Sequence, residues 1–124
     1  MTTKQAIGEF SAKIITFSFT PGPAGSVIVQ ANFEGTATGF GIVCGTMNAS
    51  SAGQPSGTFE TCVVSYPEDG NSQTGIGRGT FSKSGANRWS TQGPLQLSDG
   101  RTILGEGELD LVARTWKGKM YTAG

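Results

Sequence analysis

The chain has 124 residues, with nine Lys plus Arg against nine Asp plus Glu, and it contains no histidine. A chain of this length forms one domain over residues 1–124, and its balanced charge gives no field that would draw it to nucleic acid or to an anionic membrane. Without histidine the Ser-His-Asp triad is excluded, and two cysteines cannot build a zinc site. We therefore expect no metal and no cofactor, and any catalysis would depend on carboxylate, Tyr, Lys or Arg side chains.

The N-terminal segment MTTKQAIGEF lacks the basic start and the apolar block of a secretion signal. No apolar run in the chain approaches the roughly 18 residues that a membrane span requires. The sequence therefore predicts a cytoplasmic protein with no membrane partner.

The composition is typical of an all-β protein, because Gly, Thr, Ser, Val, Ile and Phe are frequent and turn residues recur at fairly regular spacing. Eight strands are predicted, over residues 8–19, 25–34, 36–48, 57–66, 73–83, 87–97, 101–112 and 114–121. Short connections such as PGPAG, Glu34-Gly35, PEDGN and KSGAN require antiparallel neighbours. We predict a single antiparallel eight-stranded meander closed into a small barrel, with a two-sheet sandwich as the alternative.

The two cysteines flank the connection NASSAGQPSG. If that connection is a symmetric hairpin loop centred on Gly53, Cys44 lies directly opposite Cys62. The pair could be two reduced, buried thiols or a disulfide.

Glycines alternate along three strands: Gly39 and Gly41, then Gly75, Gly77 and Gly79, then Gly105 and Gly107. Glycine weakens a strand, so each set needs a reason. The glycines could let the strands coil sharply enough to close a small barrel, or they could clear volume for a ligand beside the backbone.

In the stretch GEGELD, strand alternation places Glu106, Glu108 and Asp110 on one face. Three acids cannot line a dry core unless each finds a partner. Either this face is solvated, or it lines a polar cavity in which Arg114 or Arg78 faces an acid.

In the cavity interpretation, Glu106, Glu108 and Arg114 are the candidate catalytic residues. The candidate substrate-binding residues are Arg78, Asp110, Trp116, Trp89, Tyr66 and Phe40. Trp116 would share a strand face with Arg114 and form a stacking wall, although aromatic residues of this kind can equally fill a core or a rim.

The segments FEGTATGFGIVCGT, SGTF, GIGRGTF and GEGELDL resemble the small barrels related to allene oxide cyclase, from about residue 7 onward. That resemblance implies an eight-stranded antiparallel barrel whose lumen takes a largely apolar small molecule. In the enzymes of the family, the lumen shapes that molecule toward ring closure, and oligomers are common. No catalytic residue of the family can be placed on a position of this chain.

Two functions follow. The first is a small-molecule-binding barrel, which could be a cofactor-independent isomerase or cyclase acting on a hydrophobic metabolite. The second is a binding or assembly module without chemistry, since the chain has no histidine and no known catalytic signature. The expected partner is a hydrophobic small molecule, and a homo-oligomer is possible.

Overall fold

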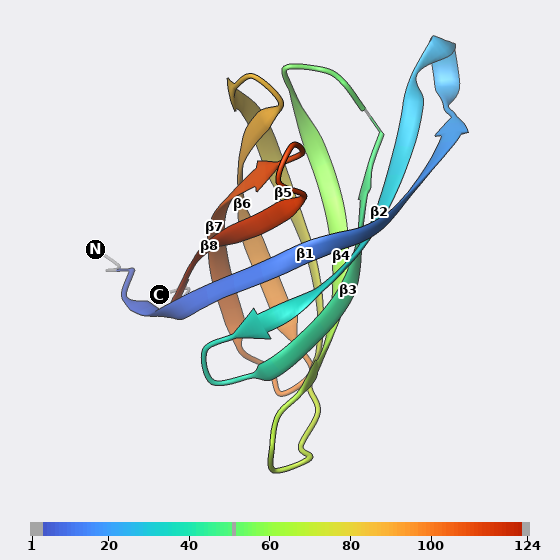
Figure 1. Ribbon diagram of the computed structural model, residues 1–124. Coiled ribbons are helices and arrows are strands. Elements are labelled where there is room, and N and C mark those ends of the chain that lie inside the picture. The colour runs from blue at the N-terminus through green and yellow to red at the C-terminus, as the bar shows by residue number, and fades with distance from the viewer. Residues whose placement is uncertain (1–3, 51, 123–124) are drawn as a thin grey trace.

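The computed structural model describes residues 4–50 and 52–122 (Figure 1). The strands are β1 (Ala6–Pro21), β2 (Val27–Ala37), β3 (Gly41–Ala49), β4 (Ser56–Tyr66), β5 (Thr74–Gly85), β6 (Arg88–Leu97), β7 (Thr102–Asp110) and β8 (Thr115–Thr122), and a short 3₁₀ helix, η1 (Pro23–Gly25), joins β1 to β2. Each strand pairs antiparallel with the next, and β8 pairs with β1. The predicted closed barrel is confirmed, and the sandwich alternative is wrong.

The described residues contain no helix that is both long and apolar enough to cross a membrane.

The turn predicted at Glu34-Gly35 is wrong, because β2 continues past this point and the chain reverses a few residues later. Gly39 and Gly41 have φ of +81° and +73°, in the left-handed region that favours glycine. Gly35 lies where β1 approaches β2 closely, and a Cβ at this position would clash with the carbonyl oxygen of Ser11. Gly35 therefore marks a strand contact and not a turn.

Side chains alternate between the lumen and the outer wall along every strand. The buried apolar residues all come from the lumen-facing set: Ala12, Ile14, Ala31, Phe33, Ala37, Met47, Ala49, Phe59, Leu97, Ile103, Trp116 and Met120. The core of this protein is therefore the interior of the barrel.

Glycines let β5 and β6 approach closely. A Cβ at Gly79 would lie 2.5 Å from the carbonyl oxygen of Gln92, and a Cβ at Gly77 would clash with that of Pro94. A larger residue at either position would push the two strands apart. These glycines support the first of the two explanations, that glycine allows the strands to coil into a small barrel.

The two cysteines are not directly opposite each other. In the β3–β4 ladder, Cys44 pairs with Val64 and Cys62 pairs with Thr46, so the predicted register is wrong by two residues. The connecting loop is not symmetric about Gly53, and this displaces the ladder. Both thiols are free and lie on the outer wall, where Cys44 is half-buried and Cys62 is exposed.

The β1–β2 hairpin is longer than the barrel wall. β1 pairs with β8 only from Ala6 to Lys13, whereas it pairs with β2 as far as Pro21. A bulge between Ile14 and Thr16 separates these two parts of the strand. Beyond the bulge the hairpin projects away from the barrel, as the blue and light-blue strands show (Figure 1).

Candidate ligand-binding site

The acids of GEGELD lie on the outer wall. Glu106 pairs with Lys4, and Arg88 lies 3.9 Å from Glu108 and 3.5 Å from Asp110, measured between nitrogen and carboxylate oxygen. The solvated-face interpretation is confirmed. The alternative, in which these acids line a polar cavity, is wrong, because the ladder turns the opposite face of β7 toward the lumen.

Asp110 is the last residue of β7, and Arg114 is the last residue of the turn that joins β7 to β8. The Asp110 carboxylate accepts hydrogen bonds from two backbone N–H groups of that turn, at 3.0 and 3.1 Å. Arg114 has φ of 56° and holds its guanidinium 5.8 Å from the centre of the Phe17 ring. The expectation that Arg114 shares a strand face with Trp116 is therefore wrong, because β8 begins only after Arg114.

Three other candidates also lie away from the middle of the lumen. Arg78 is on the outer wall, 3.3 Å from Glu60, and its side chain is 83% exposed. Tyr66 is 53% exposed on the same wall. Trp89 faces inward near one end of the barrel, where its indole N–H donates to the carbonyl oxygen of Gln54 at 3.2 Å. The polar-cavity expectation is wrong for Arg78 and Tyr66 as well, since strand alternation turns both side chains outward.

Trp116 is at the centre of a packed aromatic cluster. The rings of Phe10, Phe33 and Phe59 meet the indole edge to face, with centroid distances of 5.8, 5.1 and 5.8 Å. The indole N–H donates to the buried Thr91 hydroxyl at 2.9 Å. This part of the lumen, which we call the packed half, is therefore filled and its polar groups are satisfied.

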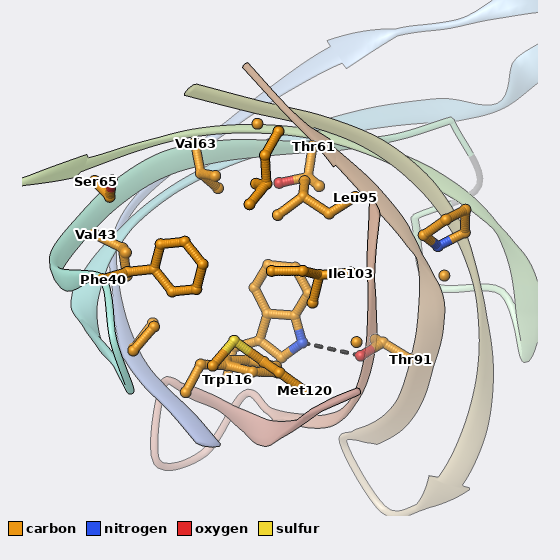
Figure 2. A pocket seen from close by; sticks show the side chains of 18 of the residues that line it. Phe40, Val43, Thr61, Val63, Ser65, Thr91, Leu95, Ile103, Trp116 and Met120 are labelled. Atoms are coloured by element: carbon orange, nitrogen blue, oxygen red, sulfur yellow. Dashed lines mark hydrogen bonds between the residues drawn. The ribbon is translucent and has the colours of Figure 1, made fainter. Parts of the chain in front are cut away.

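The other part of the lumen, the hollow half, contains a cavity of about 140 Å³ with the Trp116 cluster as its floor. Figure 2 shows side chains from around the barrel pointing toward this shared space. They include Phe40, Val43, Thr61, Val63, Ser65, Leu95, Ile103 and Met120. Gly105 keeps part of the space open, because the nearest atom to a Cβ at this position would be the carbonyl oxygen of Gly93 at 4.0 Å. Gly105 thus fits the second explanation for the glycines.

The cavity reaches the end of the barrel that carries the loops of residues 38–40, 67–73 and 98–101, which we call the mouth. Gln73 is one of the polar residues that line the cavity there, and its Oε1 accepts a hydrogen bond from the Ser98 hydroxyl at 2.8 Å. The amide nitrogen Nε2 of Gln73 donates to none of the described residues. It is therefore free to donate to a ligand that enters through the mouth.

A charged pair stands beside the mouth. The Arg101 guanidinium lies 5.4 Å from the centre of the Phe40 ring and donates to Asp99 at 2.8 Å. The backbone N–H of Arg101, assisted by its side chain, holds the pKa of Asp99 below its ordinary value. Asp99 is therefore ionised near neutral pH and offsets the positive charge of Arg101.

The hollow half presents no ionised side chain to a ligand. Among the described lining residues, Arg78 is the one ionisable residue, and its guanidinium is on the outer wall with Glu60. No cluster of three or more potential metal ligands occurs in residues 4–50 and 52–122. What this lining can do is bind and orient an uncharged molecule.

Of the candidates named from the sequence, Phe40, Trp116 and Arg78 line the cavity, but the guanidinium of Arg78 lies on the outer wall. Sequence reasoning did not select several of the other lining residues, including Thr61, Val63, Leu95, Ile103 and Met120. Strand alternation could have identified one of them, because it places Ile103 on the same strand face as Gly105, opposite the acids. The sequence does not say which of the two faces points inward, so this signal could not be used.

Comparison of the chain with protein-family models, with curated proteins and with solved structures found no match. The function therefore has to be argued from the site.

Proposed function

We propose that the protein binds a compact, uncharged and largely apolar molecule in the hollow half of its lumen. The cavity of about 140 Å³ above the Trp116 cluster carries this proposal. Interiors of proteins are normally close-packed, and an apolar void of this size costs stability unless something fills it.

The cavity volume limits the ligand to about one ring. An apolar cavity of about 150 Å³ engineered in another protein stays dry and binds benzene, whereas drug-sized ligands occupy pockets of about 300–1,000 Å³. A long, flexible chain would not fit inside a cavity of about 140 Å³.

The polar groups of the lining define the ligand further. The Trp116 indole N–H already donates to the Thr91 hydroxyl. The Thr61 hydroxyl already donates to the carbonyl oxygen of Thr46. Gln73 Nε2, at the mouth, is a donor that a ligand could use. The ligand that fits best is therefore a ring with one hydrogen-bond acceptor, held with the ring deep in the barrel and the acceptor at the mouth.

The resemblance to allene oxide cyclase-like barrels supports the same location. It also keeps a cyclase or isomerase among the possible functions, but Glu106 and Glu108 would not contact a ligand in the lumen. An uncharged lining favours binding without proton transfer, so we propose a binding protein. Any catalysis in this cavity would have to come from holding the substrate in a reactive conformation.

The test is a titration with benzene and benzaldehyde, followed by the indole N–H signals in ¹H–¹⁵N NMR spectra. We expect the Trp116 signal to shift with both compounds, and the Trp89 signal, from the far end of the barrel, to stay in place. Gln73→Leu should weaken benzaldehyde binding by about two- to tenfold, the effect of one hydrogen bond, and should not weaken benzene binding.

Two glycine variants control this experiment. Gly105→Leu places a side chain in the cavity and should abolish binding of both compounds. Gly85→Leu makes the same change at the exposed end of β5, where a Cβ would meet only the Arg88 side chain at 3.8 Å, and should bind like the wild type. A wild-type Trp116 signal that does not move with either compound would contradict the proposed function.

A further inference from the structure

The projecting part of β1 has one unpaired edge. Residues 16–21 pair with β2 on one side, and none of the described residues pairs with them on the other, because the β1–β8 ladder ends at Lys13. A strand edge of this kind presents free N–H and C=O groups and is a template for pairing with another chain. The closed barrel removes such edges elsewhere, so this segment is an exception in the fold.

Phe17 and Phe19 supply the free backbone groups. In an antiparallel ladder, residues that hydrogen-bond to the partner strand alternate with residues that do not. The Gly22 N–H donates to the carbonyl oxygen of Ser26 at 2.8 Å, which sets this alternation at the tip of the hairpin. Thr20 and Ser18 therefore bond to β2, whereas Phe19 and Phe17 direct their N–H and C=O groups toward the free edge.

Pro21 agrees with this assignment. Pro21 follows Phe17 and Phe19 at every second position, so it too would direct its backbone groups toward the free edge. Proline has no backbone N–H, and at this position β2 does not need one. Proline within a sheet is confined to such edge positions.

The sequence of this edge is its own mirror image. Residues 16–20 read Thr-Phe-Ser-Phe-Thr in both directions. Two copies that pair antiparallel about Ser18 place Phe17 opposite Phe19 of the partner subunit, and Thr16 opposite Thr20 of the partner subunit. In this register Phe17 and Phe19 are the hydrogen-bonding residues, so their free groups form four bonds between the two strands.

The side chains suit the same pairing. Phe17 and Phe19 already stack on one face of β1, with centroids 6.1 Å apart, and Phe19 is 62% exposed. Pairing of two copies gathers four Phe rings on one face and Thr and Ser hydroxyls on the other, and both kinds of cross-strand pair are favourable. No charged residue occurs from Ile14 to Phe33, so no like charges meet within this segment.

From these observations we propose that the protein forms a two-fold symmetric homodimer by antiparallel pairing of β1 with β1 of a second copy, centred on Ser18. The contact creates a four-stranded sheet in the order β2-β1-β1-β2. A lone two-stranded hairpin is marginally stable in water, whereas three or more strands can be stable, so pairing stabilises the projecting segment. None of residues 16–21 lines the cavity of the hollow half, so this contact is independent of ligand binding.

The test is sedimentation velocity from about 1 μM to about 1 mM protein, a range that covers weak and moderate dimers. The wild type should move from monomer to dimer as its concentration rises. Ser18→Lys and Ser18→Glu each place two like charges opposite each other in the dimer and should weaken it about fivefold. An equimolar mixture of these two variants should form a heterodimer tighter than either homodimer.

Gln30→Lys is the matched control. Gln30 is the β2 partner of Ser18, so the added charge lies on the same face of the hairpin but one strand away from the edge, and it should leave the dimer intact. Phe19→Pro removes the N–H at the free edge and should abolish the dimer, while its circular dichroism spectrum stays that of the wild type.

Two results would overturn the proposal. One is a wild type that stays monomeric over the whole concentration range. The other is a dimer that neither Ser18→Lys nor Phe19→Pro weakens, since that would place the contact elsewhere, for example on the outer wall at Ile42 and Ile76, which are 55% and 70% exposed.

Discussion

The two halves of the lumen are built from the same strands and the same alternation, but they are filled differently. In the packed half, Trp116 and three phenylalanine rings occupy the space between the walls, and eight buried residues form one cluster. In the hollow half, four buried residues form a second cluster beside a cavity of about 140 Å³. Side-chain size, not backbone geometry, makes one half solid and leaves the other hollow.

The difference shows how a small barrel can combine stability with a cavity. Atoms that border a void lose dispersion contacts, so the hollow half contributes less to the free energy of unfolding than its area suggests. The packed half therefore contributes most of the stability of the barrel, and the hollow half is the part that the proposed ligand would fill.

The largest contrast is expected between two phenylalanine truncations. Phe33→Ala, in the packed half, should lower the free energy of unfolding by about 3–5 kcal/mol, the usual cost for a buried ring. Phe40→Ala, at the partly exposed mouth, should cost less than about 2 kcal/mol. Chemical denaturation of both variants measures the difference, and equal costs would mean that the halves do not differ in packing.

A second contrast uses two glycines on the same face of β7. A Cβ at Gly107 would lie 2.8 Å from both the Phe10 ring and the Lys117 carbonyl oxygen. Gly107→Leu should therefore cost about 1–3 kcal/mol or more through overpacking. Gly105→Leu should leave the free energy of unfolding unchanged or raise it, because its side chain enters the cavity. A large loss of stability in Gly105→Leu would show that the cavity is too small for a leucine side chain.

The hydrogen bond beneath the cavity floor should have a smaller effect. Thr91→Val leaves the buried Trp116 indole N–H without an acceptor and should cost about 1–2 kcal/mol. The double variant Thr91→Val, Trp116→Phe has no indole N–H that lacks an acceptor. Its loss in free energy of unfolding should therefore be smaller than the sum of the losses in the two single variants. A double-mutant cycle from denaturation curves tests this, and full additivity would contradict the buried bond.

The smallest effect concerns pH and the mouth. Because the pKa of Asp99 is lowered from 3.8 in the folded protein, its ionised form stabilises the fold above that pH. This contribution is lost as the pH falls through the lowered pKa. The wild type should be slightly more stable than Asp99→Asn near neutral pH, and the gap should close in acid. A difference in stability between the wild type and Asp99→Asn that grows as the pH falls would contradict the lowered pKa of Asp99.

The sequence predicted the eight strands and their meander, because turn residues and strand-forming residues are local signals. It did not predict the second turn or the β3–β4 register, because close contacts such as that of Gly35 with β1 involve distant parts of the chain. Phe40 and Trp116 were named as candidates and line the cavity, whereas Arg78, also named and also a lining residue, directs its guanidinium to the outer wall.

The sequence also did not predict which face of β7 points into the barrel. Alternation grouped Glu106, Glu108 and Asp110 on one face and Gly105 on the other, but it left open which face was inside. Only the pairing of β7 with both β6 and β8 answers that question. Gln73 had no signal in the sequence, because its position at the mouth depends on the course of the loop before β5.

A crystal structure of the protein under xenon pressure would show directly whether the hollow half is empty. Xenon occupies apolar cavities that remain dry. If the hollow half is empty, xenon should bind there among Val63, Leu95 and Ile103, and this xenon site should be lost in Gly105→Leu. Wild-type crystals that show no xenon there, with side chains filling the lumen from end to end, would contradict the presence of this cavity.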